Sequence, residues 1–251
     1  MLIDNYQFDR YPPYTLESVQ KFQQSNDPTV LQKFKFDDIK PQSVNAFELG
    51  YAAMLGKRVM IDVLGYFSTW KNFIGYANVA NTPGSDDYNA FKDHATYVQY
   101  NIAFNGGETV NTYGYAASIS LDLGRNFVTK ANYYSDYLKN KNNSQINNFN
   151  TPHYHFNLEF ANSGFGKKQV WSFSTSLRYK PGYYYVVSGG LAAGQVPSSA
   201  VIDAQVSYKF VKARSGIRIG GTNITNKYYS TGIANPRIGA VYYVTYAYNI
   251  F

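Results

Sequence analysis

From Val44 to Phe251 the sequence repeatedly alternates apolar and polar residues, and this pattern constrains the fold more than any other feature. Successive side chains of a β-strand point to opposite faces, so a period of two predicts strands with one apolar and one polar face. The clearest stretches are residues 112–123, 171–179 and 202–210, and looser ones cover residues 45–52, 59–73, 127–137, 154–161, 217–222 and 240–250. No comparable stretch predicts a long helix, so we expect an all-β chain.

The connections between these stretches alternate between short and long. Short Gly- or Lys-containing turns are expected at residues 54–57, 124–126, 163–168 and 212–215, and long polar segments at 75–95, 139–151, 181–197 and 225–235. Bacterial outer-membrane barrels alternate in this way, with tight periplasmic turns and long extracellular loops. A soluble β-sandwich has no physical reason to do so. The pattern therefore favours an antiparallel transmembrane β-barrel.

Residues 97–104 also alternate, and they resemble a tenth strand closed by a turn at residues 105–109. Counting them as a membrane strand would place the turn at 124–126 and the loop at 139–151 on the wrong sides of the membrane. Assigning them to a β-excursion of the preceding outer loop restores the order. We therefore expect about nine transmembrane strands, the last of which runs towards the periplasm.

The amino-terminal part of the chain has a different character. Residues 1–42 are irregular and polar, with one short helix expected at residues 16–23. We divide the chain into an irregular extracellular loop segment, residues 1–42, and a part of the barrel, residues 43–251. No apolar run approaches the roughly 18 residues of a membrane-spanning helix. No signal peptide is visible, so we expect any export signal to lie outside this sequence.

A membrane environment explains the two faces of the strands better than a soluble sheet does. In lipid every backbone donor and acceptor must be paired, so a strand spans only as part of a closed barrel. The polar faces carry Lys130, Arg178 and Asp203, which are too hydrophilic for a tightly packed core. The apolar faces are rich in Tyr, and aromatic residues lie near strand ends, as interfacial girdles require.

Four motifs carry a resemblance to a known family. They are KPQSVNAFELGY at residues 40–51, NTPHYHFN at 150–157, VP at 196–197 with VIDAQVSY at 201–208, and GTNITNKYY at 221–229. In order and spacing they resemble the barrel strands of TonB-dependent outer-membrane receptors, particularly those of the Bacteroidetes type. The resemblance covers essentially residues 30–251.

The resemblance implies the C-terminal portion of a barrel of about 22 strands whose lumen holds a plug. The plug, the earlier strands and the segment that engages TonB are then expected outside this sequence. It implies localisation in the cell outer membrane, contact with its lipid and with the barrel-assembly machinery, and no cofactor. The implied role is energised uptake of a nutrient such as a metal chelate, vitamin, glycan or peptide.

The last strand carries the expected assembly signal, which consists of Tyr246, Tyr248 and the terminal Phe251. Members of the family often have an aromatic residue two positions before the final Phe, where this chain has Asn249. The apolar positions of the strand are even-numbered, so Phe251 is out of phase with them. A β-bulge near Asn249 would reconcile the two registers.

The sequence offers few candidate residues for metal binding, phosphate binding or catalysis. His153 and His155 would share a strand face, but two ligands with a distant His94 are fewer than a metal site needs. Asp86 and Asp87 lie in a long polar loop, and residues 164–168 lack phosphate-loop spacing and a following helix. With no Cys, three His and no Gly-x-Ser-x-Gly motif, we expect no catalytic, cofactor-binding or metal-binding residues and no enzyme activity. Substrate-binding residues are not predicted.

Partners and alternatives follow from the charge and the strand count. The net charge of +7 permits anionic partners, but the aromatic residues do not cluster with Lys and Arg, so we expect no nucleic-acid binding. One alternative is a small autonomous porin-like or adhesive barrel, against which the odd strand count argues. The other is a soluble β-rich binding module, whose sheet would also have one solvated face.

Overall fold

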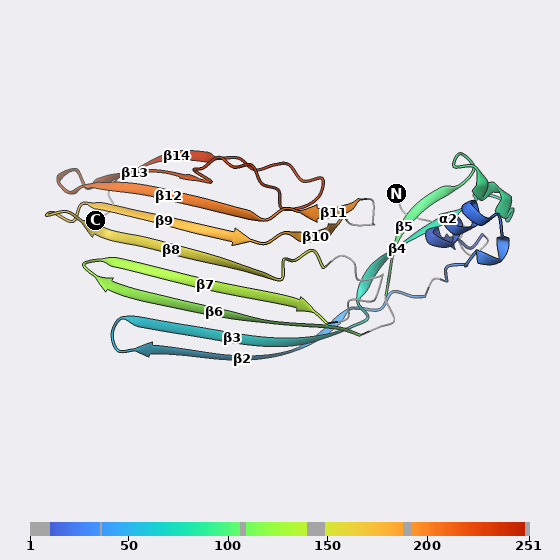
Figure 1. The fold of residues 1–251 in the computed structure, drawn as a ribbon, viewed down its shortest axis with the longest axis horizontal. Helices are drawn as coiled ribbons and strands as arrows, with labels where there is room; N and C mark the ends of the chain where they lie inside the picture. The colour runs from blue at the N-terminus through green and yellow to red at the C-terminus, as the bar shows by residue number, and fades with distance from the viewer. Residues whose placement is uncertain (1–10, 36, 106–108, 140–148, 188–191, 249–251) are drawn as a thin grey trace.

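A computed structural model describes residues 11–35, 37–105, 109–139, 149–187 and 192–248. Its main feature is a nine-stranded antiparallel sheet in which sequence neighbours lie side by side (Figure 1). In spatial order the strands are β2 (Ser43–Leu55), β3 (Val59–Lys71), β6 (Val110–Gly124), β7 (Phe127–Leu138), β8 (Tyr154–Phe165), β9 (Trp171–Lys180), β12 (Ser199–Phe210), β13 (Ser215–Thr222) and β14 (Val241–Tyr248). The prediction of about nine spanning strands is confirmed.

The register of the sheet places the alternating residues on two continuous faces. One cross-strand row is entirely apolar and consists of Tyr51, Val63, Ala117, Tyr133, Phe156 and Tyr179. A row on the opposite face is polar over most of its length and consists of Asp203, Ser176, Glu159, Lys130, Ser120 and Met60. We refer to these as the outward face and the lumenal face. Large hydrophobic side chains of the outward face are exposed, as expected for contact with lipid.

Short and long connections lie at opposite ends of the sheet (Figure 1). The four short turns join β2 to β3, β6 to β7, β8 to β9 and β12 to β13. Three of these turns place a glycine in the left-handed conformation, namely Gly56, Gly124 and Gly166, with φ values of 62°, 80° and 81°. The alternation predicted from the sequence is therefore confirmed.

A small module lies beyond the other end of the sheet (Figure 1). It contains β1 (Tyr14–Thr15), α2 (Leu16–Ser25), β4 (Ile74–Asn81), the 3₁₀ turn η2 (Tyr88–Lys92) and β5 (Val98–Asn105), with β1, β4 and β5 forming a three-stranded sheet. The helix expected at residues 16–23 is confirmed as α2. The tenth strand-like stretch is β5, which pairs with β4 outside the nine-stranded sheet, as the excursion predicted.

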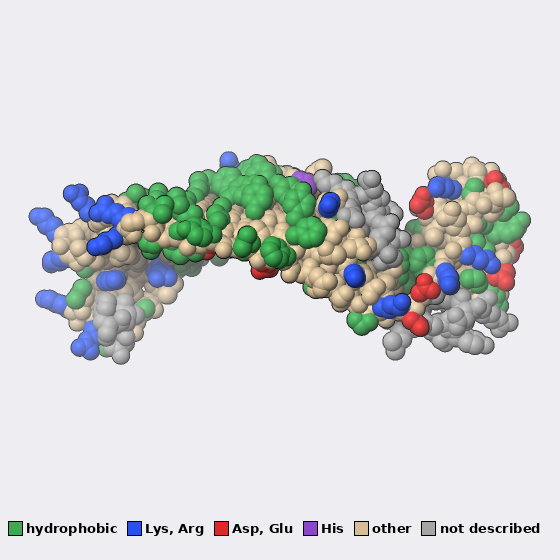
Figure 2. Space-filling view, turned by 90° about the horizontal axis from the view of Figure 1, so that it is seen from below, with side chains coloured by type: hydrophobic (Ala, Val, Ile, Leu, Met, Phe, Trp, Pro, Cys, Tyr) green, Lys and Arg blue, Asp and Glu red, His purple; other side chains and the backbone are tan. Residues whose placement is uncertain are grey.

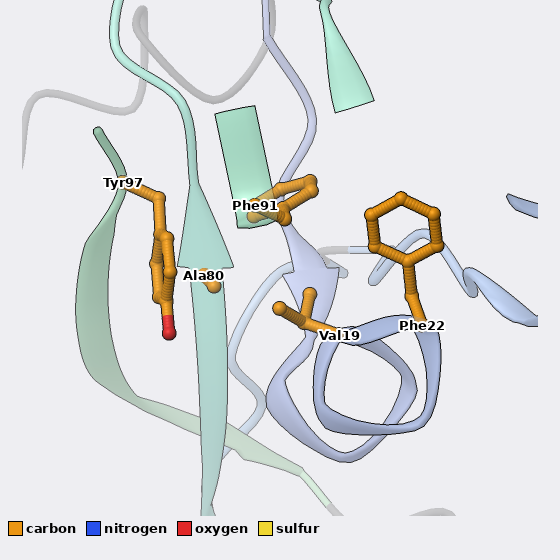
Figure 3. Close-up of a cluster of buried hydrophobic side chains, with 5 residues drawn as sticks. All are labelled: Val19, Phe22, Ala80, Phe91 and Tyr97. Atoms are coloured by element: carbon orange, nitrogen blue, oxygen red, sulfur yellow. The ribbon is translucent and has the colours of Figure 1, made fainter. Parts of the chain in front are cut away.

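The module is held together by its own hydrophobic core. Figure 3 shows this core, which consists of Val19, Phe22, Ala80, Phe91 and Tyr97. The helix begins at Thr15, whose side chain accepts a hydrogen bond from the Ser18 amide, and it ends at Asn26 in the left-handed conformation. These caps satisfy backbone groups that a short helix leaves unpaired.

Two shorter features complete the described chain. The long segment at residues 181–197 contains a hairpin of β10 (Tyr183–Val186) and β11 (Ala193–Val196). The 3₁₀ turns η1 (Pro28–Val30) and η5 (Val211–Ala213) lie in connections. Among the described residues, no helix is both long and apolar enough to cross a membrane.

Candidate functional site

The lumenal face is organised around an ion pair between Arg178 of β9 and Asp203 of β12. Arg178 donates from Nε to Asp203 Oδ2 at 2.8 Å and from Nη2 to Oδ1 at 3.0 Å, which makes the pair bidentate. The amide of Asn223, just beyond β13, donates to Asp203 Oδ1 at 2.9 Å. Both side chains are partly exposed, at 43% and 22%. This carboxylate therefore links three neighbouring segments of the polar wall.

Two tyrosines lie flat against this wall because glycines face them. Tyr243 donates to Gln205 Oε1 at 3.0 Å, and a Cβ on Gly220 would lie 2.7 Å from the Tyr243 hydroxyl oxygen. Tyr66 donates to Asp136 Oδ1 at 2.6 Å, and a Cβ on Gly114 would lie 2.6 Å from its ring. Each glycine leaves the space that the aromatic ring occupies on the adjacent strand.

A pocket of about 320 Å³ opens at the loop end of the lumenal face. Its nitrogen-bearing lining comes from β8 and β9, which supply His155, Arg178 and Lys180. The remaining lining residues are Asn157, Tyr179, Tyr183, Val196, Pro197, Ser199, Val201, Tyr229, Ser230 and Thr231. None of the described residues that line it is acidic, but Asp203, just outside the lining, offsets the charge of Arg178, so the positive charge of the pocket comes mainly from Lys180.

The hairpin β10–β11 and the segment after β13 cover this pocket. Tyr183 donates to the carbonyl oxygen of Thr231 at 2.8 Å, which joins the two segments. Burial raises the pKa of the Tyr183 hydroxyl, and Tyr185 raises it further, so this hydroxyl stays a neutral donor. Asn150 binds the hairpin from a third segment, since its side chain bonds both the amide and the carbonyl of Val186. The pocket is therefore built from parts of the chain that are distant in sequence.

The proposed assembly residues lie on the outward face of β14. Tyr246 pairs with Ile217 and Tyr248 pairs with Ser215, and the two tyrosine side chains are 64% and 73% exposed. Both belong to the even-numbered apolar row. Phe251 and the bulge expected near Asn249 lie outside the described residues.

The expectation that His153 and His155 share a strand face is wrong. The ring of His155 stacks on that of Tyr134 on the lumenal face, with ring centroids 4.8 Å apart. His153 stacks on Tyr137, whose position on β7 belongs to the opposite face. The reason is that β8 begins only at Tyr154, so His153 does not follow the alternation of the strand. Among the described residues, no three His, Cys, Asp or Glu side chains converge as a metal site would require.

The remaining sequence candidates have structural roles. Asp87 caps η2 by accepting the amide of Asn89 at 2.9 Å. Residues 164–168 run from the end of β8 into the short turn before β9, where Gly166 has a φ of 81°. His94 lies beside the Tyr97 hydroxyl in the small module, far from the lumenal wall. Sequence reasoning missed Lys180 and Tyr229, because only the folded loops bring them together.

The nine-stranded sheet has the features of the wall of an outer-membrane β-barrel. One face is apolar and the other polar, and short turns lie at one end with long loops at the other. The sequence matches the family described as TonB dependent receptor-like, beta-barrel, over residues 6–226. The chain therefore belongs to this family of outer-membrane transport receptors, which are not enzymes.

Solved structures show the same fold. The copper transporter OprC has a TM-score of 0.61 and 14% identity, over 84% of this chain and 32% of that one. The siderophore receptor PirA from Acinetobacter baumannii has a TM-score of 0.58 and 17% identity, over 84% and 32%. The pyoverdine receptor FpvA from Pseudomonas aeruginosa has a TM-score of 0.59 and 14% identity, over 83% and 30%. This chain thus spans under a third of the length of these structures. A search of curated protein sequences gave no match.

Proposed function

We propose that this chain is the C-terminal part of a TonB-dependent receptor that imports a scarce nutrient across the outer membrane, driven by energy delivered through TonB. The observation that carries the proposal is the family match over residues 6–226, which contain eight of the nine strands of the sheet, where a complete transporter barrel has about 22 strands. The four motifs support a receptor of the Bacteroidetes type. The plug and the TonB-contacting segment would belong to the rest of the receptor, and the barrel-assembly machinery would recognise Tyr246, Tyr248 and Phe251.

The two edges of the sheet support a larger barrel. Within the described residues, β2 and β14 each pair with one neighbour only. An unpaired backbone group in lipid costs several kcal/mol, so such edges are stable in a membrane only when further strands cover them. We propose that the occupants are the earlier strands of the same barrel, which would close it between β2 and β14.

The pocket at the loop end supports a ligand that carries an anionic group. Lys180 supplies positive charge, His155 and Arg178 supply further N–H groups, and Tyr183 and Tyr229 supply hydroxyl groups. Among metal chelates, vitamins, glycans and peptides, an anionic metal chelate suits this lining best. The names of the similar receptors, which bind siderophores and pyoverdine or transport copper, support the same choice.

Uptake by living cells tests the proposal. Cells with and without the receptor are given a labelled ferric chelate, cobalamin, an oligosaccharide and a peptide, each with and without a protonophore. We expect receptor-dependent uptake of the chelate that the protonophore abolishes. Uptake that survives the protonophore, or equal uptake by both cell types for all four probes, would contradict energised import.

A second experiment separates this proposal from a small autonomous barrel. Residues 1–251 are produced alone or together with the remainder of the receptor, and outer membranes are run on unheated gels. We expect a heat-modifiable band only when both parts are present, because β2 and β14 then have partners. A heat-modifiable, ion-conducting barrel formed by residues 1–251 alone would favour the porin-like alternative.

A further inference from the structure

The four short turns carry a concentration of positive charge. Seven basic residues lie in them: Lys57, Arg58, Arg125, Lys167, Lys168, Lys212 and Arg214. All seven are exposed, and none of the turns contains an acidic residue. Figure 2 shows Lys and Arg side chains gathered at this end of the sheet, next to the hydrophobic surface. We call these seven residues the basic rim.

The basic rim accounts for the net charge of the whole chain. The sequence has 23 Lys and Arg and 16 Asp and Glu, so the 16 basic residues outside the rim balance the acidic residues one for one. The number of rim cations therefore equals the net charge of +7. Uniform scattering of cations would not produce this distribution.

The rim cations are not neutralised by the described part of the chain. Its ion pairs join Lys21 to Glu17, Lys35 to Asp37 and Arg178 to Asp203, all away from the rim. The closest acidic residue in sequence is Asp122 near the end of β6, whose Oδ1 accepts a hydrogen bond from the Gly124 amide at 2.8 Å. Seven exposed charges of one sign thus face the surroundings of this end.

Aromatic side chains show the depth at which the rim lies. On the outward face the ring of Phe165 packs against that of Trp171, with ring centroids 6.3 Å apart. The ring of Trp171 packs against that of Tyr208, with centroids 4.7 Å apart. Such aromatic side chains lie at the level of the lipid head groups. Lys167 follows Phe165 by two positions and Lys212 follows Phe210 by two positions, so the rim cations begin where the aromatic row ends. Long Lys and Arg side chains reach from there into the head-group layer.

We propose that the basic rim binds the phosphate groups of anionic phospholipids in the periplasmic leaflet of the outer membrane. A lipid surface fits better than a folded partner because the charge extends along the whole edge of the sheet. Adjacent hairpins are spaced by two strands, or about 10 Å, so the rim forms a row of cations and not one cleft. The bound head groups fix the height of the barrel in the bilayer. This interaction is independent of which nutrient the receptor imports.

Native mass spectrometry of the complete receptor in detergent tests the proposal with two added lipids, phosphatidylglycerol and phosphatidylcholine. The rim variant replaces Lys57, Arg58, Lys167 and Lys168 with Gln. A matched control replaces four exposed lysines near the other end, Lys21, Lys33, Lys35 and Lys40, with Gln. Unheated gels establish that each variant is folded.

We expect the rim variant to bind phosphatidylglycerol at least about fivefold more weakly, which is the contribution of a single Lys or Arg near an anionic surface. Phosphatidylcholine binding and the control variant should change less than twofold. Raising the salt concentration should weaken phosphatidylglycerol binding to the unmodified receptor and to the control variant, both of which keep the rim, and should leave phosphatidylcholine binding unchanged. Unchanged phosphatidylglycerol binding in the rim variant, equal loss of both lipids, equal loss in the control variant or salt-independent binding would each overturn the proposal.

Discussion

Gly114 on β6 lies directly opposite Tyr66 on β3, and the space beside it is already filled. A Cβ at position 114 would lie 2.1 Å from the backbone oxygen of Ser135 and 2.6 Å from the ring of Tyr66. Real side chains do not approach this closely, so Gly114→Ala must displace both the ring and the β7 backbone. Because the carbonyl oxygen belongs to the backbone, no rotamer change of Tyr66 alone relieves the contact.

The cost has two parts. Overpacking of this kind typically destabilises by about 1–3 kcal/mol. Displacing Tyr66 also weakens its 2.6 Å hydrogen bond to Asp136, and a bond to a charged group contributes about 1.5–3 kcal/mol. Water in the lumen replaces part of that bond, so we expect Gly114→Ala to lower the free energy of unfolding by about 2–4 kcal/mol.

Gly65 provides the matched control, since it is adjacent to Tyr66 on the same strand. A Cβ at position 65 would meet nothing within 4 Å. Alanine in a strand interior is about 0.5–1 kcal/mol better than glycine, so Gly65→Ala should leave stability unchanged or raise it. Adding Tyr66→Ala to Gly114→Ala should rescue only part of the loss, because the contact with Ser135 remains.

The assay is urea unfolding of the complete receptor in lipid vesicles, followed by tryptophan emission and by heat-modifiability on gels. With a slope of about 3 kcal/mol per molar urea, the predicted loss moves the midpoint down by roughly 1 M. Equal midpoints for the Gly114→Ala and Gly65→Ala variants would refute the reasoning. Complete rescue by Tyr66→Ala would refute the role given to the Ser135 carbonyl.

Three further outcomes follow from the structure. Asp203→Ala should lower the same urea midpoint, at a cost of about 1–3 kcal/mol, because Arg178 loses its acceptor; an unchanged midpoint would show that the pair contributes nothing. Phe22→Ala should cost the small module about 3–5 kcal/mol and make residues 82–96 sensitive to protease while the barrel stays heat-modifiable; resistance to cleavage would contradict the core assigned to it. Thr15→Ala should make the same segment only mildly sensitive to protease. The lost capping bond is long, at 3.4 Å, so its cost should lie near the lower end of the range of about 0.5–2 kcal/mol for helix caps. Sensitivity as great as that of Phe22→Ala would contradict this ranking.

The nine spanning strands could be predicted because their signals are local. Alternation within each strand and alternation of loop lengths between strands both follow from neighbours in sequence. They also excluded residues 97–104 from the sheet, and these residues do form β5, paired with β4. The same signals assigned Arg178 and Asp203 to a polar face.

The small module and the pocket could not be predicted in this way, because distant contacts create them. Gln23 donates to the carbonyl oxygen of Phe91, 68 positions away, and Asn81 donates to that of Tyr11, 70 positions away. The strands of the β10–β11 hairpin have four residues each, too few for a clear period of two. Alternation gives the face of a side chain but not the register that brings Arg178 against Asp203.

The topology inferred for these nine strands has them cross the outer membrane with their short turns in the periplasm and their long loops outside. The chain has no cysteine, so a single introduced cysteine can be labelled without background from this part of the receptor. Two variants are compared: Asp86→Cys in the long connection between β3 and β6, and Lys168→Cys in the turn between β8 and β9. Both positions are exposed on the protein surface. Each variant is treated with a large membrane-impermeant maleimide. This topology predicts that intact cells label the first variant alone, and that the second reacts only after the outer membrane is permeabilised. Labelling of Lys168→Cys in intact cells, or protection of Asp86→Cys, would contradict it.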